Sequence, residues 1–121
     1  MANHFLTPDQ LEQRLLVFGI AVCRSLRGAE HDLVWQHIAL QLVRCSTSPA
    51  ANYGEARAAE SRRDFIHKMQ ICLKELRVTA IWLRFRSGIY GVTKGSADLI
   101  DECQELMLII AAGIRTARRS K

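Results

Sequence analysis

The fold is decided by residues 46–86, STSPAANYGEARAAESRRDFIHKMQICLKELRVTAIWLRFR. Ser61 is a good N-cap, because its hydroxyl can accept from the free amides of the next helical turn. Asp64, three residues on, can reach back toward the cap and favours the positive end of the helix dipole. Apolar residues then recur at intervals of three and four, at Phe65, Met69, Cys72, Leu76 and Leu83, with Ile66, Leu73 and Ala80 alongside. The pattern predicts an amphipathic helix over about 62–86 that packs against more than one neighbour.

The opposite face of this predicted helix carries positive charge. Within about 100 degrees of arc lie Arg63, His67, Gln70, Lys74, Arg77 and Arg84. Two interpretations fit this row: an ordinary solvated face, or a strip that meets phosphates. Further basic candidates are Arg57, Arg62, Lys68 and Arg86, and in the C-terminal tail Arg115, Arg118, Arg119 and Lys121. No base-reading motif accompanies them, so any binding to nucleic acid is expected to follow the backbone, with little sequence preference and strong salt dependence.

Four segments of this stretch form a recognisable motif: TSPAANYGEA, then AAESRRDFIHK, ICLKE and IWLRF. They resemble a bacterial family of four-helix-bundle proteins related to those encoded in intervening sequences of 23S ribosomal RNA genes. The positions that match the family's motif residues are Asn52, Tyr53, Glu55, Glu60, Ser61, Asp64, Phe65, His67, Lys68, Trp82 and Leu83. The match covers the second and third predicted helices, and the first and fourth fit it in pattern only.

The resemblance implies a small up-down bundle that assembles into a ring-like homo-oligomer, usually a pentamer, without known catalytic activity. A basic relative is the accessory subunit of a retroelement reverse transcriptase and binds nucleic acid, so the resemblance implies that role as well. The sequence departs from the family at four positions. Pro49 replaces a small or aliphatic residue, Val78 an acid that is often present, and the pair Ala80 and Ile81 a basic and an aromatic residue.

Composition fits one helical domain. The chain has 121 residues, 49% of them apolar, and only two prolines, which is typical of a compact helical protein with a single core. Its net charge of +5 suits polyanionic partners or simple solubility, and does not decide between them. The cysteines are spread one to each predicted helix without a CxxC pair, at Cys23, Cys45, Cys72 and Cys103. This spacing indicates buried reduced thiols and no zinc site.

The first helix is predicted over about 7–27. A Thr-x-x-Gln capping box opens it at Thr7, with Pro8 at the first helical position, and Gly28 is expected to end it. Asp32 is expected to cap a second helix over about 32–60.

Pro49 interrupts this second pattern, since proline removes an amide donor and disfavours helical geometry just before it. The helix is expected to kink near Pro49 and to resume; the alternative is that it ends near Thr47 and residues 50–60 form a separate turn. Asn52 and Glu55, just past the proline, are interpreted as residues that stabilise the following junction by hydrogen bonding to freed backbone.

A loop is predicted from Ser87 to Gly95, and Ser96 is expected to cap a fourth helix over about 96–118. Four helices with short connections predict an all-α, antiparallel up-down bundle in a single domain, residues 1–121. The apolar segments 15–23 and 106–114 exceed the stripe that a monomeric bundle buries, which predicts self-association.

No catalytic residue, cofactor or metal site is expected. Asp64 and His67 share a face, as ligands in di-iron bundles do, but no second such pair exists. Neither His4 nor His31 nor His37 has a partner that suggests a base and a nucleophile. Without a targeting segment or an apolar run of about 20 residues, the protein is expected in the cytoplasm.

The favoured hypothesis is therefore a non-enzymatic, basic homo-oligomer that binds RNA or DNA backbone, as an accessory to a larger nucleic-acid enzyme such as a reverse transcriptase or to ribosomal RNA. The alternative is a structural or adaptor oligomer with a protein partner and no nucleic-acid role.

Overall fold

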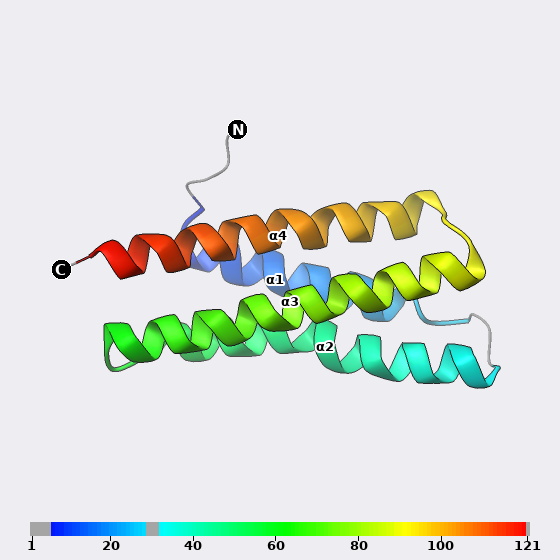
Figure 1. The fold of residues 1–121 in the computed structure, drawn as a ribbon, viewed down its shortest axis with the longest axis horizontal. Helices are drawn as coiled ribbons and strands as arrows, with labels where there is room; N and C mark the ends of the chain where they lie inside the picture. Colours follow the sequence, from blue (N-terminus) through cyan, green and yellow to red (C-terminus); the bar gives the residue numbers. More distant parts are fainter. Residues whose placement is uncertain (1–5, 29–31, 121) are drawn as a thin grey trace.

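The computed structural model describes residues 6–28 and 32–120, and His4, His31 and Lys121 lie outside this part of the chain. The described residues form the helices α1 (Pro8–Arg24), α2 (Leu33–Arg57), α3 (Arg62–Tyr90) and α4 (Lys94–Arg119), and no strand. Figure 1 shows these helices lying side by side as a bundle. The prediction of an all-α, four-helix fold is confirmed for this part of the chain.

The helix starts follow the predicted caps. At Thr7 both halves of the capping box form, with Pro8 in the first turn. Asp32 accepts from the amide of Trp35 at 2.7 Å and so caps α2. The Ser61 hydroxyl accepts from the Asp64 amide at 3.0 Å, while no bond from the Asp64 carboxylate back to the cap is seen in the described structure.

The end of α1 differs from the prediction. The helix stops at Arg24 and Ser25 is its C-cap, so Gly28 lies beyond it, in a turn where its φ of 67° suits glycine. The Ser25 hydroxyl donates to the Val22 carbonyl at 2.6 Å. This side chain satisfies a helix-end carbonyl before the glycine is reached, which explains the early stop.

Pro49 lies inside α2, which continues to Arg57, so the helix does not end near Thr47. Figure 1 shows α2 changing direction near its middle. Past the proline, the Asn52 side-chain amide donates to the Ser48 carbonyl at 3.0 Å and to the Ser48 hydroxyl at 2.8 Å. These bonds help the second half of α2 to continue as helix.

The predicted loop at Ser87 and Gly88 is wrong, because α3 runs through both residues to Tyr90. A glycine within a helix costs only about 0.5–1 kcal/mol. Tyr90 offsets that cost: its ring meets Trp35 edge to face at 4.9 Å, and its hydroxyl donates to Asp32 Oδ1 at 2.7 Å. Tertiary contacts therefore extend the helix by one turn.

The start of α4 is corrected as well. Gly91, with φ of 95°, makes the break, and the N-cap is Thr93 rather than Ser96. Ser96 is the third residue of the helix and closes a capping box, since its hydroxyl accepts from the Thr93 amide at 2.9 Å. Ser96 therefore takes part in capping α4 as its third residue, and not as the predicted N-cap.

The core runs the length of the bundle. Its fully buried large side chains are Leu15, Phe18 and Val22 of α1, Leu42 of α2, Leu76 and Leu83 of α3, and Leu106 and Ile110 of α4. The four cysteines are free thiols; all but Cys23 are buried. Burial raises the pKa of the Cys72 and Cys103 thiols to about 12. None of the helices in the described part is long and apolar enough to cross a membrane.

Candidate nucleic-acid interface

The predicted basic row of α3 lies on the surface of the bundle. Every member of the row that the sequence singled out for binding is exposed: Arg63, His67, Lys74, Arg77 and Arg84. The row is not purely polar, because Ile81 and Phe85 fall within it and are 46% and 51% exposed. The face that α3 turns away from the core is therefore cationic with two apolar interruptions.

Arg86 is not part of this surface, so its assignment to the binding set is corrected. It is only 6% exposed, and its Nη1 donates to the Ser25 hydroxyl of α1 at 2.8 Å. The reason is its register: Arg86 follows Thr79 by seven residues and Leu83 by three, and both of these are buried. Burial lowers the pKa of its guanidinium.

The C-terminal arginines Arg115, Arg118 and Arg119 are exposed on α4. Two of them meet the basic row of α3 at a groove of about 270 Å³ between the two helices. Its lining is Gln70, Leu73 and Arg77 from α3, and Ala111, Ile114, Arg115 and Arg118 from α4. Three arginines from two helices thus surround one groove with an apolar floor, which we call the arginine groove.

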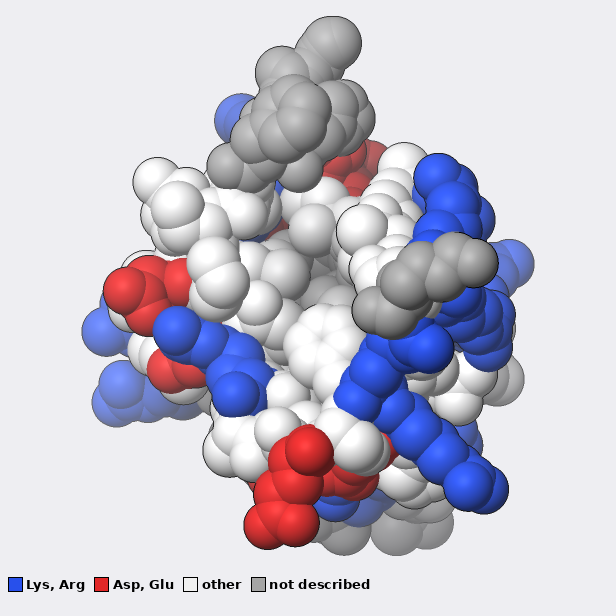
Figure 2. All heavy atoms as spheres, turned by 90° about the vertical axis from the view of Figure 1, so that its left-hand side faces the viewer, with Lys and Arg blue, Asp and Glu red and all other residues white. Residues whose placement is uncertain are grey.

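The cations of this surface have no acidic partner among the described residues, in contrast to basic residues elsewhere. Arg14 forms a two-pronged pair with Glu102 at 2.7 and 2.8 Å, Arg57 pairs with Asp9 and Glu12, and Lys68 pairs with Glu55. No ion pair of the described structure includes Arg63, Lys74, Arg77, Arg84, Arg115, Arg118 or Arg119. Figure 2 shows Lys and Arg side chains gathered on one flank of the molecule, the flank that faces the viewer in Figure 1.

The motif residues of the family pattern lie mainly in packing contacts. Tyr53 is buried, and Phe65 packs against the core from a half-buried position. Glu55 pairs with Lys68 at 2.7 Å and so links α2 to α3, whereas its predicted role was to bind freed backbone. The half-buried Trp82 lies against His37 and Phe85, with ring centroids 5.4 and 5.3 Å apart.

Apolar side chains are exposed on other helices. The predicted exposure of segment 15–23 agrees with Leu16, Val17 and Ile20, which are 42%, 53% and 49% exposed. For segment 106–114 the expectation is largely wrong, because Leu106, Ile110 and Ile114 are buried and Leu108 is the exposed large residue. α4 packs on both α3 and α1.

Sequence reasoning missed the arginine groove, although it named the arginines. Their meeting depends on the register of α4 against α3, for which the sequence carries no direct signal. It also missed the exposure of apolar residues on α2 and α3, which are Leu33, Val34, Leu40, Val43, Ile81, Phe85 and Ile89. Within the described ranges, no three His, Cys, Asp or Glu side chains come together in a way that could hold a metal ion.

No protein-family model matches the chain, and no curated protein matches it either. Among solved structures, the fold is similar to that of a protein with unknown function from the S23 ribosomal protein family of Bacteroides thetaiotaomicron. The two sequences are 25% identical, the alignment covers 86% of this chain and 97% of that chain, and the TM-score is 0.77. This similarity supports a broad relation between the chain and that family and an all-helical fold; it establishes no link to intervening sequences or to a reverse transcriptase.

Proposed function

We propose that this protein is a non-enzymatic, cytoplasmic nucleic-acid-binding bundle that contacts the phosphate backbone of RNA or DNA through the arginine groove and the basic row of α3. The observation that carries the proposal is the meeting of Arg77, Arg115 and Arg118 around one groove without an acidic partner among the described residues. Unpaired arginines are available to phosphates without first breaking an ion pair.

The chemistry of these side chains favours backbone contact over base reading. A guanidinium presents a planar fork of donors that matches two phosphate oxygens. None of the described residues that line the arginine groove is aromatic and could stack on a base, and α3 presents no compact set of base-reading amides. Binding of this kind is weakly sequence-specific and decreases steeply with salt.

Homo-oligomerisation belongs to the same proposal. The family resemblance implies an up-down bundle in a ring, usually a pentamer, and the exposed apolar residues of α1 suit contact with another copy. Repetition of the arginine groove around such a ring multiplies a weak contact through avidity. An accessory role beside a reverse transcriptase or a ribosomal RNA follows from the resemblance alone.

The test compares two double variants that lower the formal net charge of +5 by the same two units: Arg77→Gln with Arg115→Gln at the groove, and Arg24→Gln with Arg27→Gln on the opposite end of the bundle. The readout is fluorescence anisotropy of labelled single-stranded and double-stranded RNA and DNA over a range of salt. We expect the groove variant to bind more weakly and to reduce the slope of log K against log salt by about 0.7–0.9 for each lost phosphate contact.

The control variant keeps the wild-type slope if binding is local to the groove. Equal losses in the two variants would mean that net charge alone attracts the polyanion. Absence of binding at low salt would refute the proposed function.

A second function is favoured by a different observation, the exposed apolar side chains on α2 and α3. Leu40 is 67% exposed, and Phe85 and Ile89 are each about half exposed. These side chains suit a protein partner, so an adaptor role without nucleic acid is the alternative. Absence of binding at low salt, together with a stable oligomer, would favour it.

A further inference from the structure

A second hollow lies at the other end of the bundle from the arginine groove. Its volume is about 540 Å³, and it opens where the last turn of α3 and the first turn of α4 come close to the end of α1 and the start of α2. Its polar and aromatic lining includes Ser25, Trp35, Arg86, Tyr90, Thr93 and Ser96. We call it the Arg86 cavity.

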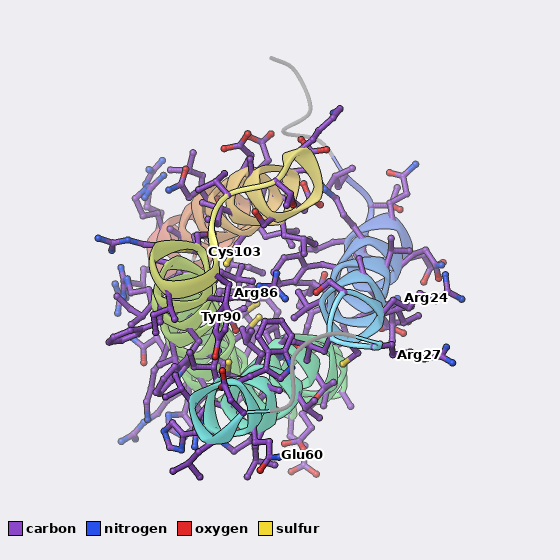
Figure 3. The ribbon with its side chains drawn as sticks, turned by 90° about the vertical axis from the view of Figure 1, so that its right-hand side faces the viewer. Arg24, Arg27, Glu60, Arg86, Tyr90 and Cys103 are labelled. Carbon is purple, nitrogen blue, oxygen red and sulfur yellow. The ribbon has the colours of Figure 1, made fainter. Side chains whose placement is uncertain are left out.

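Arg86 supplies the buried positive charge of this cavity, and the exposed Arg24 also lines it. Figure 3 shows the Arg86 side chain pointing from α3 into the interior of the bundle, whereas Arg24 and Arg27 point outward. The Arg86 side chain makes one hydrogen bond in the described structure, from Nη1 to the Ser25 hydroxyl at 2.8 Å. A guanidinium carries five N–H donors, so most of its hydrogen-bonding capacity is left for another group in the cavity.

No described residue neutralises this charge. None of the described lining residues is acidic, and no ion pair of the described structure includes Arg86. Asp32 is linked to the cavity through Trp35 and Tyr90, and its Oδ1 already accepts from the Trp35 amide and the Tyr90 hydroxyl at 2.7 Å each. A buried cation without a counter-charge is unfavourable, which makes the cavity a place where an anion gains energy.

The start of α4 adds to the positive potential. Thr93, Gly95 and Ser96 line the cavity at the N-terminus of this 26-residue helix, where amides not bonded within the helix and the helix dipole favour negative charge. The Thr93 and Ser96 side chains are engaged with each other's amides in the capping box. The amides of Lys94 and Gly95, in the first turn, have no intrahelical acceptor.

We propose that the Arg86 cavity binds a small molecule through an oxyanion, a phosphate or carboxylate group that accepts from the Arg86 guanidinium. The fork of that guanidinium suits two oxygens of either group. The volume lies in the range of pockets for small organic ligands, and Trp35 and Tyr90 provide apolar wall beside the charge. The site lies apart from the arginine groove, so it does not depend on the proposed nucleic-acid function.

The experiment measures thermal unfolding and calorimetric titration with inorganic phosphate and with acetate, each against sodium chloride at equal ionic strength. We expect at least one of the two anions to raise the Tm of the wild type by about 3–6 °C at about ten times its Kd. Stabilisation by phosphate alone assigns a phosphate group, and stabilisation by acetate assigns a carboxylate. No effect of either beyond chloride would overturn the proposal.

Variants locate the site. Arg86→Gln is expected to weaken anion binding about ten- to a hundredfold, since it removes a charge-assisted hydrogen bond. Arg86→Lys keeps the charge without the fork and should retain part of the binding, which also covers the case in which Arg86→Gln does not fold. Arg27→Gln removes one charge from an exposed side chain outside the cavity lining and should bind the anion as the wild type does. An unchanged response in both Arg86 variants would overturn the proposal.

Discussion

At the scale of single residues, one glycine sets how closely two helices approach. A Cβ atom at position 19 would lie 2.8 Å from the backbone carbonyl oxygen of Ser46, a distance that real Cβ atoms do not tolerate. Gly19 therefore lets α1 lie directly against the backbone of α2, just before the proline at position 49. A Cβ at Gly54, also in α2, would meet nothing within 4 Å.

These two glycines make a matched pair of predictions. Gly19→Ala should lower the free energy of unfolding by about 1–3 kcal/mol, because the methyl group forces the two backbones apart. Gly54→Ala should raise it by about 0.5–1 kcal/mol, because alanine restricts the unfolded chain and favours helix. Urea unfolding followed by circular dichroism measures both. A stabilising Gly19→Ala would mean that α1 and α2 are less closely packed than described.

Residue periodicity was informative where it was followed strictly. The intervals from Met69 through Cys72, Leu76 and Leu83 identified the buried ridge of α3 correctly. Extended by the same intervals, the ridge includes Thr79 and Arg86, which are buried too. Arg86 was grouped with the surface cations because of its charge, although its position already indicated the core. Residue type, not spacing, produced that error.

At the scale of the helices, two buried thiols connect neighbouring elements. The Cys72 thiol of α3 donates to the Pro49 carbonyl of α2 at 3.5 Å, and the Cys103 thiol of α4 donates to the Leu76 carbonyl of α3 at 3.2 Å. Pro49 and Leu76 are themselves buried, so the thiols lie at helix interfaces that water does not reach. Ionisation of either thiol would place a negative charge there.

The stability of the bundle should therefore fall in alkali. The unfolded thiols release protons from near their ordinary pKa of 9.0, whereas the folded ones hold them until about 12. The folded state binds more protons between these values, so stability is lost as pH rises through that range, by about 1.4 kcal/mol per thiol and pH unit. From about pH 8 to about pH 10 the two thiols should cost the wild type about 2–3 kcal/mol.

The measurement is urea unfolding at both pH values for the wild type and for Cys72→Ala with Cys103→Ala. The double variant should show a smaller loss between the two pH values, whatever its stability at neutral pH. An identical pH dependence in wild type and double variant would contradict the assignment of alkaline instability to these thiols.

Helix existence was predictable and helix ends were less so. Caps such as Thr7 and Asp32 act locally, so their signal is complete in a few neighbouring residues. The extension of α3 to Tyr90 depends instead on Trp35 and Asp32, which are distant in sequence. Packing also decides between a kinked second helix and one that ends near Thr47. Pro49 is buried, and its contacts with neighbouring helices hold it inside α2.

At the scale of the whole molecule, the arrangement of the helices separates two kinds of surface. In the described structure α1 packs on α2 and α4, and α3 packs on α2 and α4, so α1 and α3 are diagonal in the bundle. The exposed apolar side chains of α1 and the basic row of α3 therefore lie on opposite sides. Contact between copies through α1 leaves the basic row uncovered.

This separation leads to a prediction about assembly. Light scattering coupled to size exclusion should give the wild type a mass several times the 13.7 kDa of one chain. Ile20→Lys places a charge in the exposed apolar surface of α1 and should shift the protein to monomer, because the charge must be desolvated at any contact there. Val92→Lys, at a loop residue that is 69% exposed, adds the same charge and should leave the mass unchanged.

The monomeric variant also tests whether assembly serves binding. Ile20→Lys keeps the arginine groove and adds a positive charge, so electrostatics alone predicts equal or tighter binding to a polyanion. If several grooves act together on one strand, the same variant binds a long RNA more weakly than Val92→Lys does, and the two bind a short oligonucleotide alike. A wild type that is monomeric in dilute solution would contradict the predicted assembly. An Ile20→Lys variant that binds long RNA as tightly as Val92→Lys does would show that assembly does not contribute to binding.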